Sequence, residues 1–271
     1  MNLPKRVTLE LTNRCNRQCQ GCPRRKMTYP QGDMSWQLFA KVIEQLPKST
    51  IVVPFFRGES LLHPRFADMM VNLRKFGDVQ FATNGDNLIG PNIDAILETC
   101  SFVSLSLHSF KYPRQTGNIS FFYRALGNGV KTQVSILDSL VPKRKKRKFV
   151  KAWRLHVDRV RIYVEHSHKG FGDVERNVLD DGRPCVKPFE DMVVYWDGKV
   201  GLCNHDWNNG VDLGDLNVQT VAEAWNNNGY NEVRRLHQNG LRHQVASCKS
   251  CDYWMVSYLP KKMFGELYIN G

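Results

Sequence analysis

Short apolar runs alternate with amphipathic stretches along the first 165 residues of the chain. The apolar runs are typical of buried strands and cover residues 7–12, 49–56, 79–85, 102–108, 131–137 and 157–165. Between them, apolar side chains recur every three or four positions over residues 34–46, 64–77, 93–100 and 120–126, which predicts helices. Pro47 and Gly77 then mark where the first two helices end.

This alternation predicts an α/β fold in which crossover helices connect the strands of a parallel sheet. About six strand–helix units are too few for a closed eightfold barrel, so we expect a partial (β/α)6 TIM-like barrel over residues 1–179. In such folds the functional side chains follow the carboxyl ends of the strands. The loops directly after the predicted strands are therefore the places where site residues are expected.

A different pattern begins near residue 180, where glycine and proline interrupt the alternation. Residues 192–203 are typical of two short strands around an Asp-Gly turn. Residues 218–228 and 231–240 carry the spacing of short helices. We therefore expect a small domain, a β-hairpin plus helix, over residues 180–256, followed by a C-terminal tail over residues 257–271.

The composition narrows the class of protein. No apolar run approaches the ~20 residues of a membrane span, and the N-terminus lacks the hydrophobic region of a signal peptide. We therefore expect a cytoplasmic protein with no membrane partner. The formal net charge of +12 favours an anionic partner. Much of that charge lies in residues 143–148, where we expect a solvated loop, with a phosphate-binding patch as the alternative.

Eight cysteines in a cytoplasmic chain point to metal binding or catalysis, because thiols stay reduced in that compartment. Three of them, Cys15, Cys19 and Cys22, follow the first predicted strand. Three thiolates can hold three irons of a 4Fe–4S cluster and leave the fourth iron open to another ligand. A structural zinc site would need a fourth protein ligand, and the nearest histidine is His63.

A second set of cysteines lies in the C-terminal part of the chain and consists of Cys185, Cys203, Cys248 and Cys251. Four well-spaced thiolates form a closed site that suits either a 4Fe–4S cluster or zinc, and the spacing alone leaves both open. The eighth cysteine, Cys100, ends a predicted helix before a buried strand, where we expect a plain core thiol.

The spacing Cys15-x-x-x-Cys19-x-x-Cys22 after a first strand resembles the signature of the radical S-adenosylmethionine (SAM) enzymes. Arg57-Gly58-Glu59, after the second strand, resembles the Gly-Gly-Glu motif of that family, with Arg57 in place of the first glycine. The residues that the resemblance assigns to SAM binding are Gly58, Glu59, Ser60, Thr83, Asn84, Gly85, Ser104 and Ser106. Gly21 departs from the aromatic residue that many members carry there, so the resemblance does not extend to that adenine contact.

The second cysteine set resembles the twitch domain, a shortened relative of the SPASM domain that holds an auxiliary iron–sulfur cluster. The resemblance rests on a hairpin between Cys185 and Cys203, the segment Glu223-Ala224-Trp225 and the final Cys248-x-x-Cys251 pair. It implies two 4Fe–4S clusters and SAM as cofactors. Length and cysteine spacing are most similar to those of the 2-deoxy-scyllo-inosamine dehydrogenases.

The resemblance also implies a reaction. SAM is reductively cleaved to a 5′-deoxyadenosyl radical, which abstracts a hydrogen atom from the substrate. A two-electron oxidation, or dehydrogenation, would follow, with the auxiliary 4Fe–4S cluster as electron acceptor. A base must then remove a proton, and the catalytic candidates by position are His108, Glu165 and His166. The electron donor that the resemblance implies is a flavodoxin- or ferredoxin-type protein.

Two alternatives stay open from the residues. The basic segment 143–148 also suits an anionic substrate, such as a nucleic acid, a nucleotide-linked group or a peptide, that undergoes radical rearrangement or epimerisation. A non-catalytic zinc-dependent nucleic-acid-binding protein would fit the Cys248-x-x-Cys251 pair and the positive charge. The placement of Cys15–Cys22 and Gly58-Glu59 at strand ends argues against that class, because a binding module has no need of it.

Overall fold

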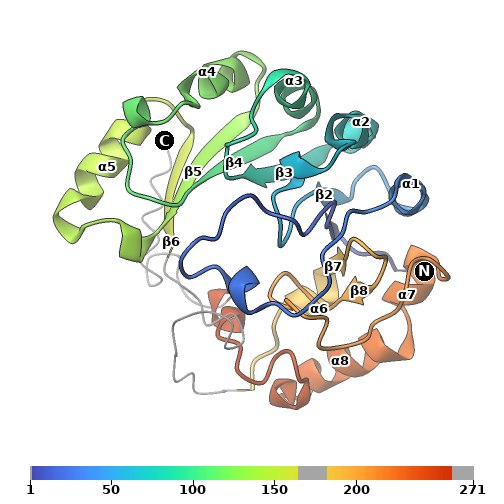
Figure 1. Cartoon of the computed structure of the whole chain (residues 1–271). Helices are drawn as coiled ribbons and strands as arrows, with labels where there is room; N and C mark the ends of the chain where they lie inside the picture. The colour runs from blue at the N-terminus through green and yellow to red at the C-terminus, as the bar shows by residue number, and fades with distance from the viewer. Residues whose placement is uncertain (1, 164–181, 258–271) are drawn as a thin grey trace.

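The computed structural model describes residues 2–163 and 182–257 of the chain. Its centre is one curved sheet of eight strands in the spatial order β6-β5-β4-β3-β2-β1-β7-β8 (Figure 1). The strands are β1 (Arg6–Leu9), β2 (Ile51–Val53), β3 (Asp78–Thr83), β4 (Phe102–Leu107), β5 (Lys131–Leu137), β6 (Arg159–Tyr163), β7 (Asp191–Val194) and β8 (Val200–Gly201).

The first six strands pair with their sequence neighbours in parallel, so each connection must cross over the sheet. The helices that make the crossovers are α1 (Trp36–Glu44), α2 (Phe66–Asn72), α3 (Gly90–Thr99), α4 (Ile119–Gly127) and α5 (Lys146–Trp153). Figure 1 shows these five helices along the outer side of the curved sheet. This arrangement confirms the predicted α/β class and partial TIM-like barrel.

Period-two alternation explains the two faces of the sheet. On β1, Val7 and Leu9 are fully buried and pack in the same core as Phe39 and Val42 of α1. The intervening residues of the inner strands line a cavity on the opposite face, and those residues include Arg6 and Thr8 of β1. The barrel therefore has an apolar outer layer and a polar interior.

The predicted hairpin forms, but it does not stand apart from the barrel. β7 pairs in parallel with β1, with Arg6 opposite Asp191, and β8 pairs antiparallel with β7. Leu202 and Trp225 belong to the same buried core as the barrel side chains. Short helices complete this part, namely α6 (Lys187–Glu190), α7 (Val221–Trp225) and α8 (Asn228–Gln238). The predicted boundary at residues 179–180 and nearly all of the tail lie outside the described residues, so the division into domains stays a prediction.

The expectation of a solvated loop over residues 143–148 is wrong for its second half. Lys146 begins α5, because Phe149, Val150 and Trp153 give the following residues a buried face that anchors a helix. The sequence pattern did not predict this helix, because residues 143–148 are all cationic and the apolar side chains come after them. Among the described helices, none is long and apolar enough to cross a membrane.

Candidate active site

The first cysteine set, Cys15, Cys19 and Cys22, occupies the loop after β1, and all three side chains are half-buried. The loop turns tightly, because the backbone N–H of Cys22 donates to the carbonyl of Cys19 at 3.2 Å. Burial raises the pKa of the Cys19 thiol, and the neighbouring Cys22 and Cys15 raise it further. The three thiols are therefore close enough to oppose one another's ionisation. A positively charged group beside them would stabilise the thiolates.

Arginines surround the mouth of this site. A small pocket is lined by Cys19 and Cys22 together with Arg17, Arg24 and Arg25. Arg24 is held in place, since its Nε donates to the carbonyl of Asn13 at 3.0 Å. Thiolates and anionic ligand groups both suit such a cationic surrounding. The loop can therefore hold a metal cluster and a carboxylate beside it.

Gly58 explains how the turn after β2 reaches the cysteine loop. A Cβ at this position would lie 2.5 Å from the carbonyl oxygens of Thr12 and Arg14, so only glycine fits. The next residue, Glu59, donates its backbone N–H to the carbonyl of Arg14 at 2.8 Å. The turn is thus joined to the backbone that leads directly into Cys15.

The carboxylate of Glu59 connects the ends of two strands. It accepts hydrogen bonds from the Thr83 hydroxyl at 2.9 Å and from the backbone N–H of Asn84 at 2.7 Å. Burial raises the pKa of Glu59, although these two donors oppose that rise. The Asn84 amide donates to Asn16 in the cysteine loop at 2.8 Å, and Gly85 donates its N–H to the Thr83 hydroxyl at 3.0 Å. The structure therefore brings these predicted SAM contacts together beside the cysteines.

The three serines predicted to contact SAM lie in two different places. Ser60 is fully buried, and its hydroxyl donates to the carbonyl of Pro54 at 2.9 Å. Ser104 and Ser106 instead line the cavity inside the barrel. The Ser104 hydroxyl accepts a hydrogen bond from the side-chain amide of Gln133 at 2.8 Å. The contact of these serines with SAM stays a prediction.

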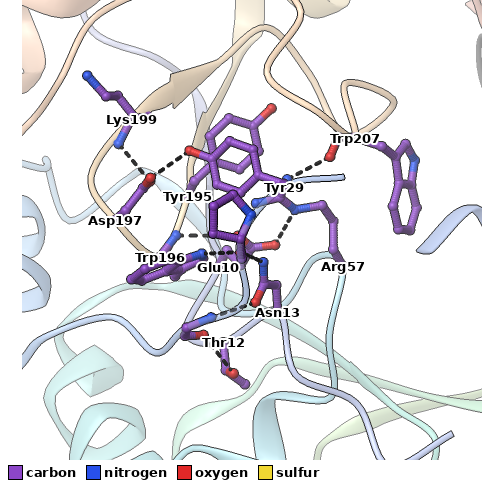
Figure 2. A network of polar contacts seen from close by, with 12 residues as sticks. Glu10, Thr12, Asn13, Tyr29, Arg57, Tyr195, Trp196, Asp197, Lys199 and Trp207 are labelled. Carbon is purple, nitrogen blue, oxygen red and sulfur yellow. Dashed lines mark hydrogen bonds and ion pairs between the residues drawn. The ribbon is translucent and has the colours of Figure 1, made fainter. Parts of the chain in front are cut away.

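Arg57, which stands where the family motif has glycine, forms a fully buried ion pair with Glu10. Its Nη1 also donates to the carbonyl of Trp207 at 2.7 Å. The guanidinium lies over the rings of Tyr29 and Tyr195, 4.3 and 4.1 Å from their centroids. Figure 2 shows this network, which draws residues from the segment between β1 and α1, from the turn after β2 and from the segment around β7 and β8. Arg57 thus ties the first cysteine site to the C-terminal part of the chain.

The second cysteine set lines one cavity between α6, β8 and α8, and its members are Cys185, Cys203, Cys248 and Cys251. Backbone N–H groups point at two of the sulfurs, from His205 to Cys203 and from Tyr253 to Cys251, each at 3.4 Å. Burial raises the pKa of Cys251 to about 11 and that of Cys203 well above its usual value. Ser247 lines the same cavity, and its buried hydroxyl has no hydrogen-bond partner within the described part of the chain.

These features fit an iron–sulfur cluster. Buried thiols with raised pKa values bind as thiolates only when a metal supplies positive charge, and the Ser247 hydroxyl is available to a sulfide.

The large cavity inside the barrel encloses about 1360 Å³ of empty space, part of which is open to solvent. Its walls carry polar, charged and aromatic side chains from strands β1 to β7, among them Arg6, Gln133 and Arg161. Lys187, His205 and Tyr253 line this cavity and also the cavity of the second cysteine set. One layer of side chains therefore separates the two spaces.

Sequence reasoning missed these three wall residues, although a local signal marks them. Each stands two positions after a cysteine, as Lys187 follows Cys185. Backbone N–H groups at this offset point at a cysteine sulfur, which places the side chain of the same residue beside the metal site. The offset could therefore have been read from the sequence.

Of the three predicted catalytic residues, the structure describes His108 alone. His108 is exposed at the end of β4, in a smaller pocket that it shares with Arg17 and Asp86. Partial loss of water around the imidazole lowers the pKa of His108, and the positive charge of Arg17 lowers it further. Glu165 and His166 lie outside the described residues. Cys100 is buried in the core, as predicted.

Comparison with known proteins gives two family matches. Residues 9–140 match the radical SAM superfamily, and residues 185–252 match the SPASM iron-sulfur cluster-binding domain. The chain is 25% identical over 262 residues to the S-adenosyl-L-methionine-dependent 2-deoxy-scyllo-inosamine dehydrogenase of Niallia circulans, covering 91% of this chain and 92% of the relative. It is 33% identical over 98 residues to the tungsten-containing aldehyde ferredoxin oxidoreductase cofactor-modifying protein of Pyrococcus furiosus, but that match spans only 28% of the relative.

Solved structures show the same fold. The crystal structure of BtrN in complex with AdoMet and 2-DOIA superposes with a TM-score of 0.71 at 20% identity, covering 93% of this chain and 94% of that chain. Streptococcus suis SuiB bound to precursor peptide SuiA superposes with a TM-score of 0.68 at 10% identity, covering 96% of this chain and 74% of that chain. The two differ in what they bind, so the fold alone does not give the substrate.

Proposed function

Because this chain belongs to the radical SAM superfamily and carries a SPASM cluster-binding domain, we propose that it is a SAM-dependent dehydrogenase of a small polar substrate. The family confirms the predicted enzyme class and the predicted cofactors, which are iron–sulfur clusters and SAM. It also sets aside the non-catalytic zinc-dependent nucleic-acid-binding alternative. The residues that bind each cofactor and the outcome of the reaction are our proposal.

Two sets of ligands support separate clusters. Cys15, Cys19 and Cys22 would hold the cluster that leaves one iron open to the amine and carboxylate of SAM. The second set, which we call the quartet, is Cys185, Cys203, Cys248 and Cys251, and it would close all four positions of an auxiliary 4Fe–4S cluster. When bound, these cofactors supply a 5′-deoxyadenosyl radical that takes a hydrogen atom from the substrate, and an acceptor for the electron that remains.

The protein's own side chains would bind SAM and fix its orientation. Glu59 would accept the ammonium group of SAM, and the donors Thr83 and Asn84 fix the direction of its carboxylate. Gly58 allows this turn to lie against the cysteine loop, while Ser60 and Gly85 hold the flanking backbone. Ser104 and Ser106 would contact SAM from the barrel interior.

One observation carries the choice of dehydrogenation. Lys187, His205 and Tyr253 line both the barrel cavity and the quartet cavity, so the substrate space adjoins the auxiliary site. A nearby acceptor favours removal of the second electron over rearrangement or epimerisation of the radical. Loss of a proton completes the two-electron oxidation, and His108, Glu165 and His166 stay the predicted bases.

The partners follow from the same proposal. A flavodoxin- or ferredoxin-type protein would supply the electron for SAM cleavage in the reducing cytoplasm. We choose 2-deoxy-scyllo-inosamine as the first probe substrate, because the full-length relative is its dehydrogenase. The polar barrel walls suit a hydroxylated compound of this kind.

The test uses anaerobically reconstituted full-length protein. We expect about eight irons and eight sulfides per chain, no zinc, and one SAM cleaved for each substrate oxidised. With the probe deuterated at its carbinol carbons, deuterium should appear in 5′-deoxyadenosine. About four irons would remove the proposed acceptor and favour rearrangement or epimerisation of an anionic substrate. Zinc without iron would contradict both cluster assignments.

A further inference from the structure

His237 on α8 links two of the quartet cysteines. Its ring is fully buried, and Nδ1 accepts a hydrogen bond from the backbone N–H of Cys185 at 3.1 Å. On the other side of the ring, Nε2 lies 3.6 Å from the sulfur of Cys248. One imidazole therefore touches the first and the third cysteine of the quartet.

The contact at Nδ1 fixes the tautomer of the ring. A nitrogen that accepts an N–H must carry its lone pair there, so the ring proton lies on Nε2. Nε2–H then donates, and the sulfur of Cys248 accepts. Phe189 of α6 packs edge-on against the imidazole, with ring centroids 6.4 Å apart, and helps to hold its orientation. The donor is thus aimed at the sulfur by a backbone bond and by packing.

We propose that His237 is a positioning residue that orients Cys248 and raises the reduction potential of the auxiliary cluster. The inference rests on the proposed assignment of the quartet to a 4Fe–4S cluster. A reduced cluster carries one more negative charge, which its thiolate ligands share. An N–H donor to a ligand sulfur therefore stabilises the reduced form more than the oxidised form. Enclosure away from water strengthens that hydrogen bond.

The role follows from the proposed reaction. An electron acceptor must be reduced readily enough to take an electron from a substrate radical. The quartet receives backbone N–H groups at Cys203 and Cys251, and His237 adds a side-chain donor at Cys248. His237 is therefore a residue through which the chain sets how readily its auxiliary cluster accepts an electron.

The test isolates the quartet in the full-length chain by replacing Cys15, Cys19 and Cys22 with alanine. Redox titration with EPR detection then measures the potential of the one remaining cluster. We expect His237→Phe, which keeps the ring and loses the donor, to weaken reduction about tenfold, a fall of about 59 mV for one electron. His237→Gln keeps an N–H near the position of Nε2 and should restore most of the potential.

His243→Phe provides the matched control, because His243 is an exposed histidine on the segment after α8. It should leave the potential of the cluster unchanged. Equal potentials in the parent and in His237→Phe overturn the proposed role. A parent that holds far fewer than about four irons contradicts the quartet assignment instead, so the two failures are distinguishable.

A second measurement covers the case in which His237→Phe does not retain its cluster. The parent is grown with ¹⁵N-labelled histidine, and pulsed EPR is recorded on the reduced auxiliary cluster. We expect hyperfine coupling to one histidine nitrogen and to one exchangeable proton, both altered in His237→Gln. The absence of any histidine coupling in a loaded parent overturns the inference.

Discussion

The two cysteine sites of this protein differ in how the chain builds them. Cys15, Cys19 and Cys22 come from one loop after β1, and all three side chains are half-buried. The quartet comes from three separate segments whose members share one cavity, with Cys185 and Cys248 buried and Cys203 and Cys251 half-buried. An open site with three thiolates leaves room for a ligand such as SAM, whereas a closed site with four does not. Enclosure therefore separates two roles that the same thiol chemistry could serve.

The two sites also share a local feature. A backbone N–H two residues after a cysteine points at its sulfur, from Arg17 to Cys15 at 3.5 Å and from His205 to Cys203 at 3.4 Å. This geometry depends only on the turn that follows the cysteine. The difference between the sites is thus a property of the surrounding fold and not of the turns that carry the ligands.

Cysteine substitutions should separate the sites most strongly. We expect Cys19→Ala to abolish SAM cleavage and to lower the iron content from about eight to about four per chain. Cys203→Ala should lose a similar amount of iron but keep reductive SAM cleavage without substrate. Iron analysis and chromatography of 5′-deoxyadenosine measure both. Loss of SAM cleavage in both variants would contradict the division of roles.

Arg57 connects the segment after β1 to the C-terminal part of the chain, so its removal tests how much this buried connection contributes to stability. Arg57→Met leaves Glu10 buried without its partner, which should cost about 3–5 kcal/mol of unfolding free energy. Arg57→Met combined with Glu10→Met should recover most of that loss, because no unpaired charge stays buried. Chemical denaturation of the apoprotein measures the difference.

The exposed pair of Arg235 and Glu232 serves as the control for that experiment. Arg235→Met should change the unfolding free energy far less than Arg57→Met does, because water screens the exposed pair. A double variant no more stable than Arg57→Met alone would show that the guanidinium acts through its contacts with Trp207 and the two tyrosines instead.

Gly58 tests how closely the cysteine loop depends on the turn after β2. Gly58→Ala would force two backbone carbonyls aside, at a cost of about 1–3 kcal/mol, and should weaken SAM binding more than binding of the auxiliary cluster. Gly77→Ala is the matched control, since a Cβ there meets nothing within 4 Å. Equilibrium SAM binding and iron content separate the two effects. Equal SAM affinity in both alanine variants would contradict the close approach.

The carboxylate of Glu59 should give the proposed SAM site a pH dependence of its own. Glu59→Gln should weaken SAM binding about tenfold at pH 8, where the wild-type carboxylate is ionised. Because burial raises the pKa of Glu59, acidification protonates it earlier than an ordinary glutamate. The difference between wild type and variant should therefore narrow as pH falls. A gap that stays constant down to pH 5 would argue against an ionised Glu59 at the SAM site.

The smallest expected effect concerns the electron donor. Arg24 and Arg25 lie at the mouth of the first site, where an acidic flavodoxin- or ferredoxin-type protein would meet positive charge. Raising salt from about 0.05 to 0.5 M should slow reduction by the protein donor by roughly threefold, while reduction by dithionite should change less. Arg25→Gln should reduce that salt dependence. Stopped-flow absorbance of the cluster measures each rate.

Much of the barrel could be predicted because its signals are local. The predicted strand over residues 131–137 coincides with β5, and the predicted helix over residues 34–46 contains α1. Gly58 and Glu59 could be assigned from a motif at a strand end. The loop predicted over residues 143–148 is wrong where α5 begins at Lys146, because a run of cations has no hydrophobic period until Phe149 and Trp153 are counted with it.

Long-range features could not be predicted in this way. Nothing in residues 191–194 indicates that β7 pairs with β1, since the partner lies at the other end of the chain. The contact between His237 and Cys248 likewise depends on how α8 packs against the segment after it. No pattern in a short stretch of consecutive residues predicts either contact.

The sequence by itself determined the two cysteine sets and the strand after which the first set stands, because spacing and periodicity are local properties. Only the tertiary structure decided that one site is open and the other enclosed. It also decided that Arg57 connects the segment after β1 to the C-terminal part of the chain, that three side chains line both the barrel cavity and the quartet cavity, and that His237 lies against the sulfur of Cys248. The physical reason is that burial of a site and contacts around its cysteines arise from packing between segments far apart in the chain. A local sequence pattern does not predict that packing.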